Sequence, residues 1–216
     1  MNKYRLEIIV FITGAVVMAL ELVGSRIVAP YLGASIYVWT SLIGVILASL
    51  SLGYYWGGRL ADKKPDYRTF SLLILSSAIF TGIIGIIKNP VLDAVCRFVP
   101  DIRVSAVIAA TLLFAPASVL LGTISPYAIR LRMENLEHSG ATVGRLYAIS
   151  TVGSIIGTFA AGFFLISFFG SRNILILLSL ILFAVYFLAC PGNNSRKGKV
   201  TAFFFAALLL SAHFFL

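Results

Sequence analysis

The chain alternates long apolar segments with short polar connections, and this pattern decides its fold class. A helix needs about 20 mostly apolar residues to cross roughly 30 Å of hydrocarbon. Seven segments reach or approach that length, at residues 6–28, 37–57, 69–87, 104–124, 146–169, 173–189 and 200–216. We therefore predict one all-α polytopic membrane domain over residues 1–216, whose last segment is at the short limit for a span.

Prolines and one charged segment set the predicted helix ends. We expect the first helix to turn at Pro30 and Gly33, because proline removes a backbone donor and tends to break a helix. For the same reason we expect the third helix to stop before Pro90 and the fourth before Pro126. Residues 91–103, VLDAVCRFVPDIR, are too few and too charged to span, so we expect an interfacial half-helix there.

Composition supports the membrane class. The chain is 60% hydrophobic and 12% charged, whereas soluble domains are about half apolar and about a quarter charged. The net charge of +9 would suit nucleic acid, but the basic residues lie in short loops, as membrane orientation requires. We therefore expect a lipid bilayer and no nucleic acid as partner. The cysteines and histidines lack metal-ligand spacing, so we expect no metal and no cofactor.

The basic residues also predict the orientation. Twelve of the 17 fall on the side of the N-terminus: Lys3, Arg5, Arg59, Lys63, Lys64, Arg68, Arg130, Arg132, Arg145, Arg196, Lys197 and Lys199. Cytoplasmic loops carry such an excess. We predict a multi-pass protein of the inner or plasma membrane with a cytoplasmic N-terminus, and with an external C-terminus if all seven segments cross.

Glu21 is the first candidate for a functional site. An ionisable group at membrane depth is costly, so it usually faces protein or a water-filled cavity. An acidic group beside aromatic rings suits an amine through charge pairing and cation–π contact. Arg26 is not placed to pair with Glu21 along one helix, because five residues separate them by about 140°. The candidate substrate-binding residues are Glu21, Arg26, Tyr31, Trp39, Tyr54 and Tyr55. The alternative is that Glu21 lies near the outer interface and pairs with a basic residue for packing.

The segment GGRLADKK is the most specific local motif. We expect Gly57 and Gly58 to end the second helix and Arg59 to approach the helix C-terminus, where the dipole favours cations. Asp62 would cap the next helix or accept from a nearby arginine, which would hold two spans in register. We thus predict a structural loop that includes Gly58, Arg59, Asp62 and Lys63. The alternative is an ordinary positively charged loop.

Three glycines lie inside the fifth predicted span. Gly153 and Gly157 form a GxxxG pattern, which lets helix backbones approach closely in a membrane. A dinucleotide-binding motif would need a preceding strand, so we interpret Gly153, Gly157 and Gly162 as helix-packing residues.

Longer stretches resemble known families. GGRLADKK is similar to the G-x-L-A-D-R-x-G-R loop of major facilitator transporters. Residues 14–62, 121–131 and 144–170 together resemble the membrane region of the spermidine synthase-like family, in which a major-facilitator-like bundle is fused to an aminopropyltransferase domain. The resemblance implies one half of a major facilitator bundle plus one helix. In that family the transferase domain follows the last span, and the sequence ends at Leu216 before it, so no catalytic residue carries over.

Three functions are compatible with these features. The leading hypothesis is a membrane domain that binds, senses or transports a small cationic substrate such as a polyamine. The alternative is an anchor for a separately encoded aminopropyltransferase, docked on residues 130–145 with Glu134 and Glu137; a homo-oligomer is a further expected partner. An enzyme in its own right would need a nucleophile–base pair, a metal cluster or a phosphate loop, and the sequence offers none of these.

Overall fold

The computed structural model describes residues 3–133 and 139–190, and this part of the chain consists of helices joined by short connections. Within it, six helical segments are long and apolar enough to cross a membrane. They are α1 (Lys3–Leu32), α2 (Ile36–Lys63), α3 (Tyr67–Phe98), α4 (Ile102–Arg132), α5 (Ser139–Phe159) continued by η2 (Ala160–Leu165) and α6 (Ile166–Phe168), and α7 (Ser171–Ala189). For the described residues, the prediction of an all-α chain with several helices long and apolar enough to span a membrane is confirmed. The seventh predicted span, 200–216, lies outside the described residues.

Several helices are longer than predicted. α3 runs through Pro90 to Phe98, so the expected half-helix at 91–103 is instead the continuation of α3. α4 likewise contains Pro126, and α1 contains Pro30. Proline's φ is itself helical and it removes only one hydrogen bond, so these helices continue past it. The turn after α1 comes at Gly33, whose φ of 78° favours glycine.

The prediction of a loop at GGRLADKK is wrong. α2 continues to Lys63 and therefore contains Gly58, Arg59, Asp62 and Lys63. The reason lies in the packing of α2 on α4, because a Cβ at Gly57 would lie 2.6 Å from the Cα of Thr123. The glycine lets two helices approach and does not end one.

Polar contacts hold the α2–α3 connection against α4. Asp62 accepts from the Nε of Arg130 at 3.2 Å, which confirms that Asp62 joins two helices through a nearby arginine. The cap of α3 is Asp66, which accepts from the backbone N–H of Arg68 at 3.2 Å. The buried Tyr127 hydroxyl donates to the Lys64 carbonyl and accepts from the Asp66 N–H. These bonds fix the connection between α2 and α3.

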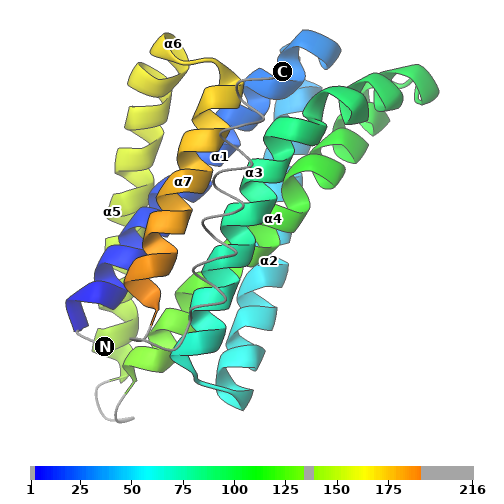
Figure 1. The fold of residues 1–216 in the computed structure, drawn as a ribbon. Helices are drawn as coiled ribbons and strands as arrows, with labels where there is room; N and C mark the ends of the chain where they lie inside the picture. The colour runs from blue at the N-terminus through cyan, green and yellow to red at the C-terminus, as the bar shows by residue number, and fades with distance from the viewer. Residues whose placement is uncertain (1–2, 134–138, 191–216) are drawn as a thin grey trace.

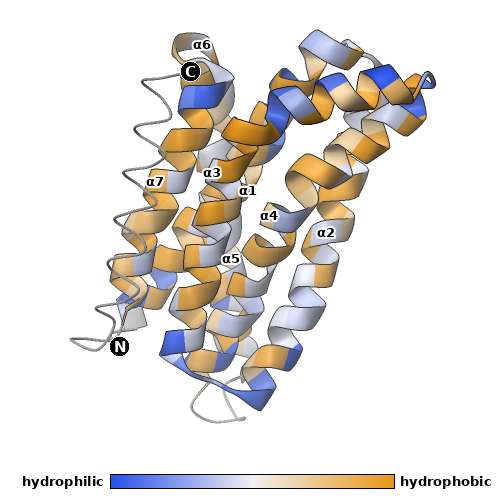
Figure 2. Cartoon of the chain, turned by 45° about the vertical axis from the view of Figure 1, so that its right-hand side comes forward, coloured by the Kyte–Doolittle hydropathy of each residue, from blue (hydrophilic) through white to orange (hydrophobic). Residues whose placement is uncertain are grey.

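The helices pack side by side in a bundle (Figure 1). α2 packs mainly on α4 and α1 mainly on α5, while α3 lies against both α4 and α7. α1 also contacts α4 and α7, so it is central to the arrangement. Figure 2 shows hydrophilic residues gathered towards the two ends of the bundle and hydrophobic residues along its length, as expected for helices that cross a membrane.

Glycines allow close contact between α1 and α5. A Cβ at Gly153 would lie 2.8 Å from the carbonyl carbon of Phe11, and one at Gly157 would lie 2.5 Å from the Cα of Ala15. Both distances are shorter than real Cβ contacts, so the prediction that these two glycines pack helices is confirmed. Gly162 faces open space within the described residues and takes no part in this contact.

Candidate functional site

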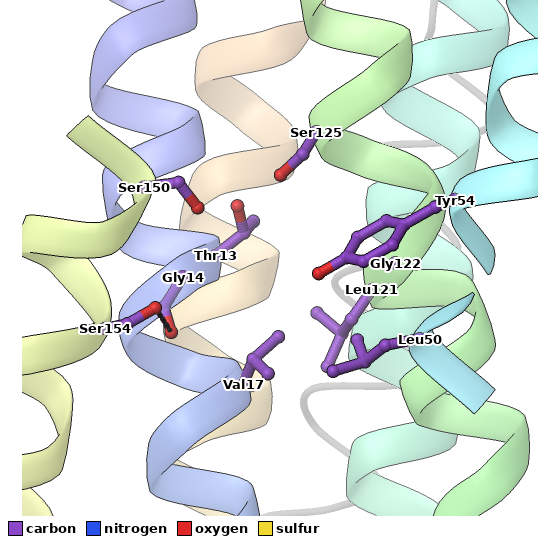
Figure 3. A pocket seen from close by; sticks show the side chains of 10 residues that line it. All are labelled: Thr13, Gly14, Val17, Leu50, Tyr54, Leu121, Gly122, Ser125, Ser150 and Ser154. Atoms are coloured by element: carbon purple, nitrogen blue, oxygen red, sulfur yellow. Dashed lines mark hydrogen bonds between the residues drawn. The ribbon is translucent and has the colours of Figure 1, made fainter. Parts of the chain in front are cut away.

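A pocket lies between α1, α2, α4 and α5 (Figure 3). Its volume is about 40 Å³. Half of its lining residues carry hydroxyl groups, although the helices that bear them are strongly apolar. The lining residues are Thr13, Gly14, Val17, Leu50, Tyr54, Leu121, Gly122, Ser125, Ser150 and Ser154.

The hydroxyl groups divide into two sets. Those of Thr13 and Ser154 donate to backbone carbonyls at 2.9 Å and 3.2 Å. Those of Tyr54, Ser125 and Ser150 make no hydrogen bond to any residue that the structure describes, and they point into the pocket (Figure 3). Ser125 and Ser150 are half-buried, and a polar group removed from water normally finds a partner. The pocket therefore presents three hydroxyls to a small polar guest.

The size of the pocket limits that guest. One water needs roughly 10–15 Å³ of such volume, so about 40 Å³ has room for a few waters or for one ammonium group. Tyr54 is 45% exposed, so the pocket is open on the side of α2. A longer molecule would enter with one end only.

Glu21 lies on the same face of α1 as the pocket. It follows Gly14 by seven residues and Val17 by four, which places it within about 20° and 40° of them around the axis and about 6 Å beyond Val17. Glu21 is half-buried, and it makes no ion pair or hydrogen bond with the described residues. It also lies about 5 Å from the midpoint of the 30-residue helix α1. The carboxylate is thus deep in the span, about one helical turn beyond the pocket residue Val17.

The remaining predicted residues lie elsewhere. Arg26 is exposed and does not pair with Glu21. Tyr31 packs against the core, and Trp39 is half-buried at the start of α2. Tyr55 is exposed, with the guanidinium of Arg59 4.4 Å above its ring. Of the six predicted residues, only Tyr54 lines the pocket, and only Glu21 shares a helix face with it.

The serine and threonine hydroxyls of the pocket were not among the residues predicted from the sequence. Ser150 and Ser154 are four residues apart and flank the packing glycine Gly153 on α5, so the three lie within one turn of the helix. That spacing could have predicted that the two serines face the same neighbouring helix and line the α5 side of the pocket. Ser125 carried no such signal, because its place depends on how α4 meets α1.

An ion cluster at the end of the bundle was also missed. The Glu7 carboxylate lies 3.1 Å from Arg132 Nη1 and 3.1 Å from Arg145 Nε. The side chains of Glu7 and Arg132 are only 12% and 14% exposed. The cluster joins α1, α4 and α5. No local pattern predicts it, because the three residues are far apart in the chain.

Comparisons with known proteins do not assign the chain to a family. No known protein family, curated protein or solved structure matches the chain. Among the described residues, no three His, Cys, Asp or Glu side chains lie close enough together to hold a metal ion.

Proposed function

We propose that this chain is an integral membrane protein that binds a small cationic solute at Glu21 and the adjoining pocket. One observation carries the proposal. Glu21 is half-buried near the middle of a span, has no partner among the described residues, and lies on the helix face that leads into the pocket.

Electrostatics favours a cation at this position. A charged group at the bilayer centre costs several kcal/mol unless it is paired or hydrated. A bound ammonium would supply the missing positive charge, and hydroxyl oxygens would accept its N–H bonds. The ring of Tyr54 offers a cation–π contact at the open side of the pocket. Arg26 points about 140° away from Glu21 on α1 and does not compete for it.

An elongated molecule with more than one ammonium group fits this layout best. Glu21 and Gly14 are separated by about 10 Å along the α1 axis, so one ammonium would occupy the pocket and a second would meet the carboxylate. A polyamine is the solute that we propose, because stretches of the sequence resemble the spermidine synthase-like family. The chain would bind, sense or transport that solute.

The proposed orientation has the N-terminus in the cytoplasm. The start of α1, the end of α2, the start of α3, the end of α4 and the start of α5 share one end of the bundle. With the α2–α3 connection, they carry nine of the 14 basic residues in the part of the chain that the structure describes. This excess is typical of the cytoplasmic side. In this orientation the pocket lies in the cytoplasmic half of the bundle, because Tyr54 is about 8 Å along α2 from Arg59.

Equilibrium dialysis of labelled spermidine against the purified full chain tests the proposal. A charge-assisted hydrogen bond contributes about 1.5–3 kcal/mol, so Glu21→Gln should weaken binding about 10- to 100-fold. Asp93→Asn is the matched control, because it removes the same charge from an exposed position on α3. Equal binding by Glu21→Gln and the parent chain, or no binding by the parent, would refute the proposal.

The anchor hypothesis predicts a different result. An anchor for a separate aminopropyltransferase would use the exposed basic residues at the cytoplasmic end, such as Lys63 and Arg130. Its other candidate residues, Glu134 and Glu137, lie outside the described part of the chain. Such an anchor would retain a transferase in a pull-down, and Glu21→Gln would leave that retention unchanged.

A further inference from the structure

The hydroxyl-lined pocket lies in the seam between two helix pairs. α1 and α5 form one pair and α2 and α4 the other, and these two contacts are the most extensive among the helices that the structure describes. Figure 3 shows lining side chains from α1 and α5 on one side of the pocket and from α2 and α4 on the other. The walls of the pocket therefore belong to two different units of the bundle.

Glycines make each pair a tight unit. Within the α1–α5 pair, a Cβ at Gly157 would lie 2.5 Å from the Cα of Ala15. Within the α2–α4 pair, a Cβ at Gly53 would lie 2.9 Å from the Cα of Gly122. Because the two backbones of each pair are in direct contact, we expect each pair to move as one body.

The contact between the pairs is of a different kind. A Cβ at Gly24 of α1 would meet side-chain atoms of the other pair, those of Phe114 at 3.2 Å and of Leu42 at 3.4 Å. Side chains can change rotamer, whereas backbone atoms in contact cannot move aside. The pocket itself adds about 40 Å³ of unfilled space between the pairs. The seam is therefore easier to deform than either pair.

A largely buried ion pair joins the two helix pairs at the end of the bundle where α1 begins. The Glu7 carboxylate of α1 lies 3.1 Å from Nη1 of Arg132 on α4, and the two side chains are 12% and 14% exposed. Thr13 lies about 9 Å along α1 from Glu7, and Ser125 lies about 10 Å along α4 from Arg132. The ion pair is therefore about two helical turns from the pocket on both walls.

We propose that Glu7 and Arg132 form a latch that holds the two helix pairs together beside the pocket. A pocket of about 40 Å³ admits only one end of a polyamine, so the whole molecule passes only if the pocket widens. Separation of Glu7 from Arg132 would let the pairs part at this end, while α3 and α7 still connect α4 with α1. The control of solute access rests on the function proposed above, whereas the latch itself does not.

The reaction of a pocket thiol with a bulky reagent measures the widening. Ser125→Cys, in the purified full chain without its native cysteines, places the thiol in the pocket. A methanethiosulfonate whose substituent is too large for about 40 Å³ reacts with this thiol only when the pairs part. Glu7→Gln should speed the reaction at least about tenfold, because the charge-assisted bond that holds the closed arrangement is lost. No solute takes part, so the result does not depend on whether the chain binds spermidine.

Two ion pairs that lie within the helix pairs supply matched controls. Arg145→Gln removes another partner of the Glu7 carboxylate, but Arg145 belongs to the same pair, α1–α5. Asp62→Asn breaks the ion pair with Arg130, which lies within α2–α4. Both variants should leave the rate near that of the parent, because neither removes a contact between the pairs.

Arg132→Gln tests the same latch from α4. It should also speed the reaction, although Arg132 has a further interaction besides that with Glu7. Where neither glutamine variant folds, Glu7→Asp decides, since it keeps the charge but shortens the side chain, and it should speed the reaction a few fold. The inference is overturned if the folded latch variants react no faster than Arg145→Gln, or if Arg145→Gln and Asp62→Asn speed the reaction as much as Glu7→Gln does.

Discussion

Gly157→Ala tests the close contact between α1 and α5. The added Cβ would lie 2.5 Å from the Cα of Ala15 and 2.7 Å from its carbonyl carbon, whereas ordinary contacts begin at 3.4 Å. The two helices would therefore have to separate by roughly 1 Å, since backbone atoms cannot move aside like the end of a side chain. Overpacking of this kind typically costs about 1–3 kcal/mol.

The matched control is Gly44→Ala on α2. A Cβ at Gly44 would meet nothing within 4 Å, so only the helix preference for alanine remains, which favours alanine by about 0.5–1 kcal/mol. That preference applies to both variants and cancels in their comparison. Gly157→Ala should therefore be less stable than Gly44→Ala by about 1–3 kcal/mol.

Reversible unfolding in mixed detergent micelles, followed by far-ultraviolet circular dichroism, measures the difference. We expect the free energy of unfolding to rank Gly44→Ala at or above the parent and Gly157→Ala below it. A Gly157→Ala variant as stable as Gly44→Ala would show that α1 and α5 do not meet at this glycine, and the pocket between them would then lose its basis.

Three further predictions concern the connections between helices. Tyr127→Phe keeps the ring stacked on Phe70 but removes the hydroxyl bonds to the α2–α3 connection, so the free energy of unfolding should fall by about 1–3 kcal/mol; an unchanged value contradicts that role. Backbone N–H bonds from Val104 and Arg103 hold the pKa of Asp101 below its ordinary value of 3.8. The Asp101 carboxylate therefore stabilises the fold above about pH 3.8, and this contribution is lost as the pH falls through the lowered pKa. Acid unfolding curves should show this loss in the parent but not in Asp101→Asn, and identical curves would contradict it. A cysteine at Asp66, in a chain without its native cysteines, should resist an impermeant thiol reagent in intact cells, whereas labelling from outside would reverse the orientation.

The apolar pattern predicted where the chain crosses the membrane but not where its helices end. The length of an apolar segment indicates only the part of the helix that crosses the hydrocarbon core of the bilayer. The helix itself can continue into the headgroup region, because its backbone hydrogen bonds do not require apolar side chains. This is why α2 extends past Gly58 to Lys63 and α3 past Pro90 to Phe98. Gly57 was predicted to end α2, but it lies inside the helix and packs against α4. The sequence alone does not distinguish a glycine that packs two helices from a glycine that ends one.

The candidate site was only partly predictable. Glu21 stands out in sequence because a carboxylate inside an apolar segment is costly. Tyr54 was predicted only as one of several aromatic residues that could contact an amine. Its position in the pocket depends on how α2 packs against α1 and α4, which the sequence does not show. In the ion cluster, Glu7 at the start of α1 pairs with Arg132 of α4 and Arg145 of α5. Each arginine is more than 120 positions from Glu7 in the sequence, so only tertiary packing reveals the cluster.

Protection of a pocket thiol is the most direct test of the cation site. Ser125→Cys, in a chain without its native cysteines, places a thiol in the pocket (Figure 3), and Lys63→Cys places one at the exposed end of α2. Saturating spermidine should slow the reaction of the Ser125→Cys thiol with a small methanethiosulfonate reagent and leave that of Lys63→Cys unchanged. Adding Glu21→Gln should abolish the protection. Equal reaction rates at Ser125→Cys with and without spermidine would contradict a cation site in this pocket.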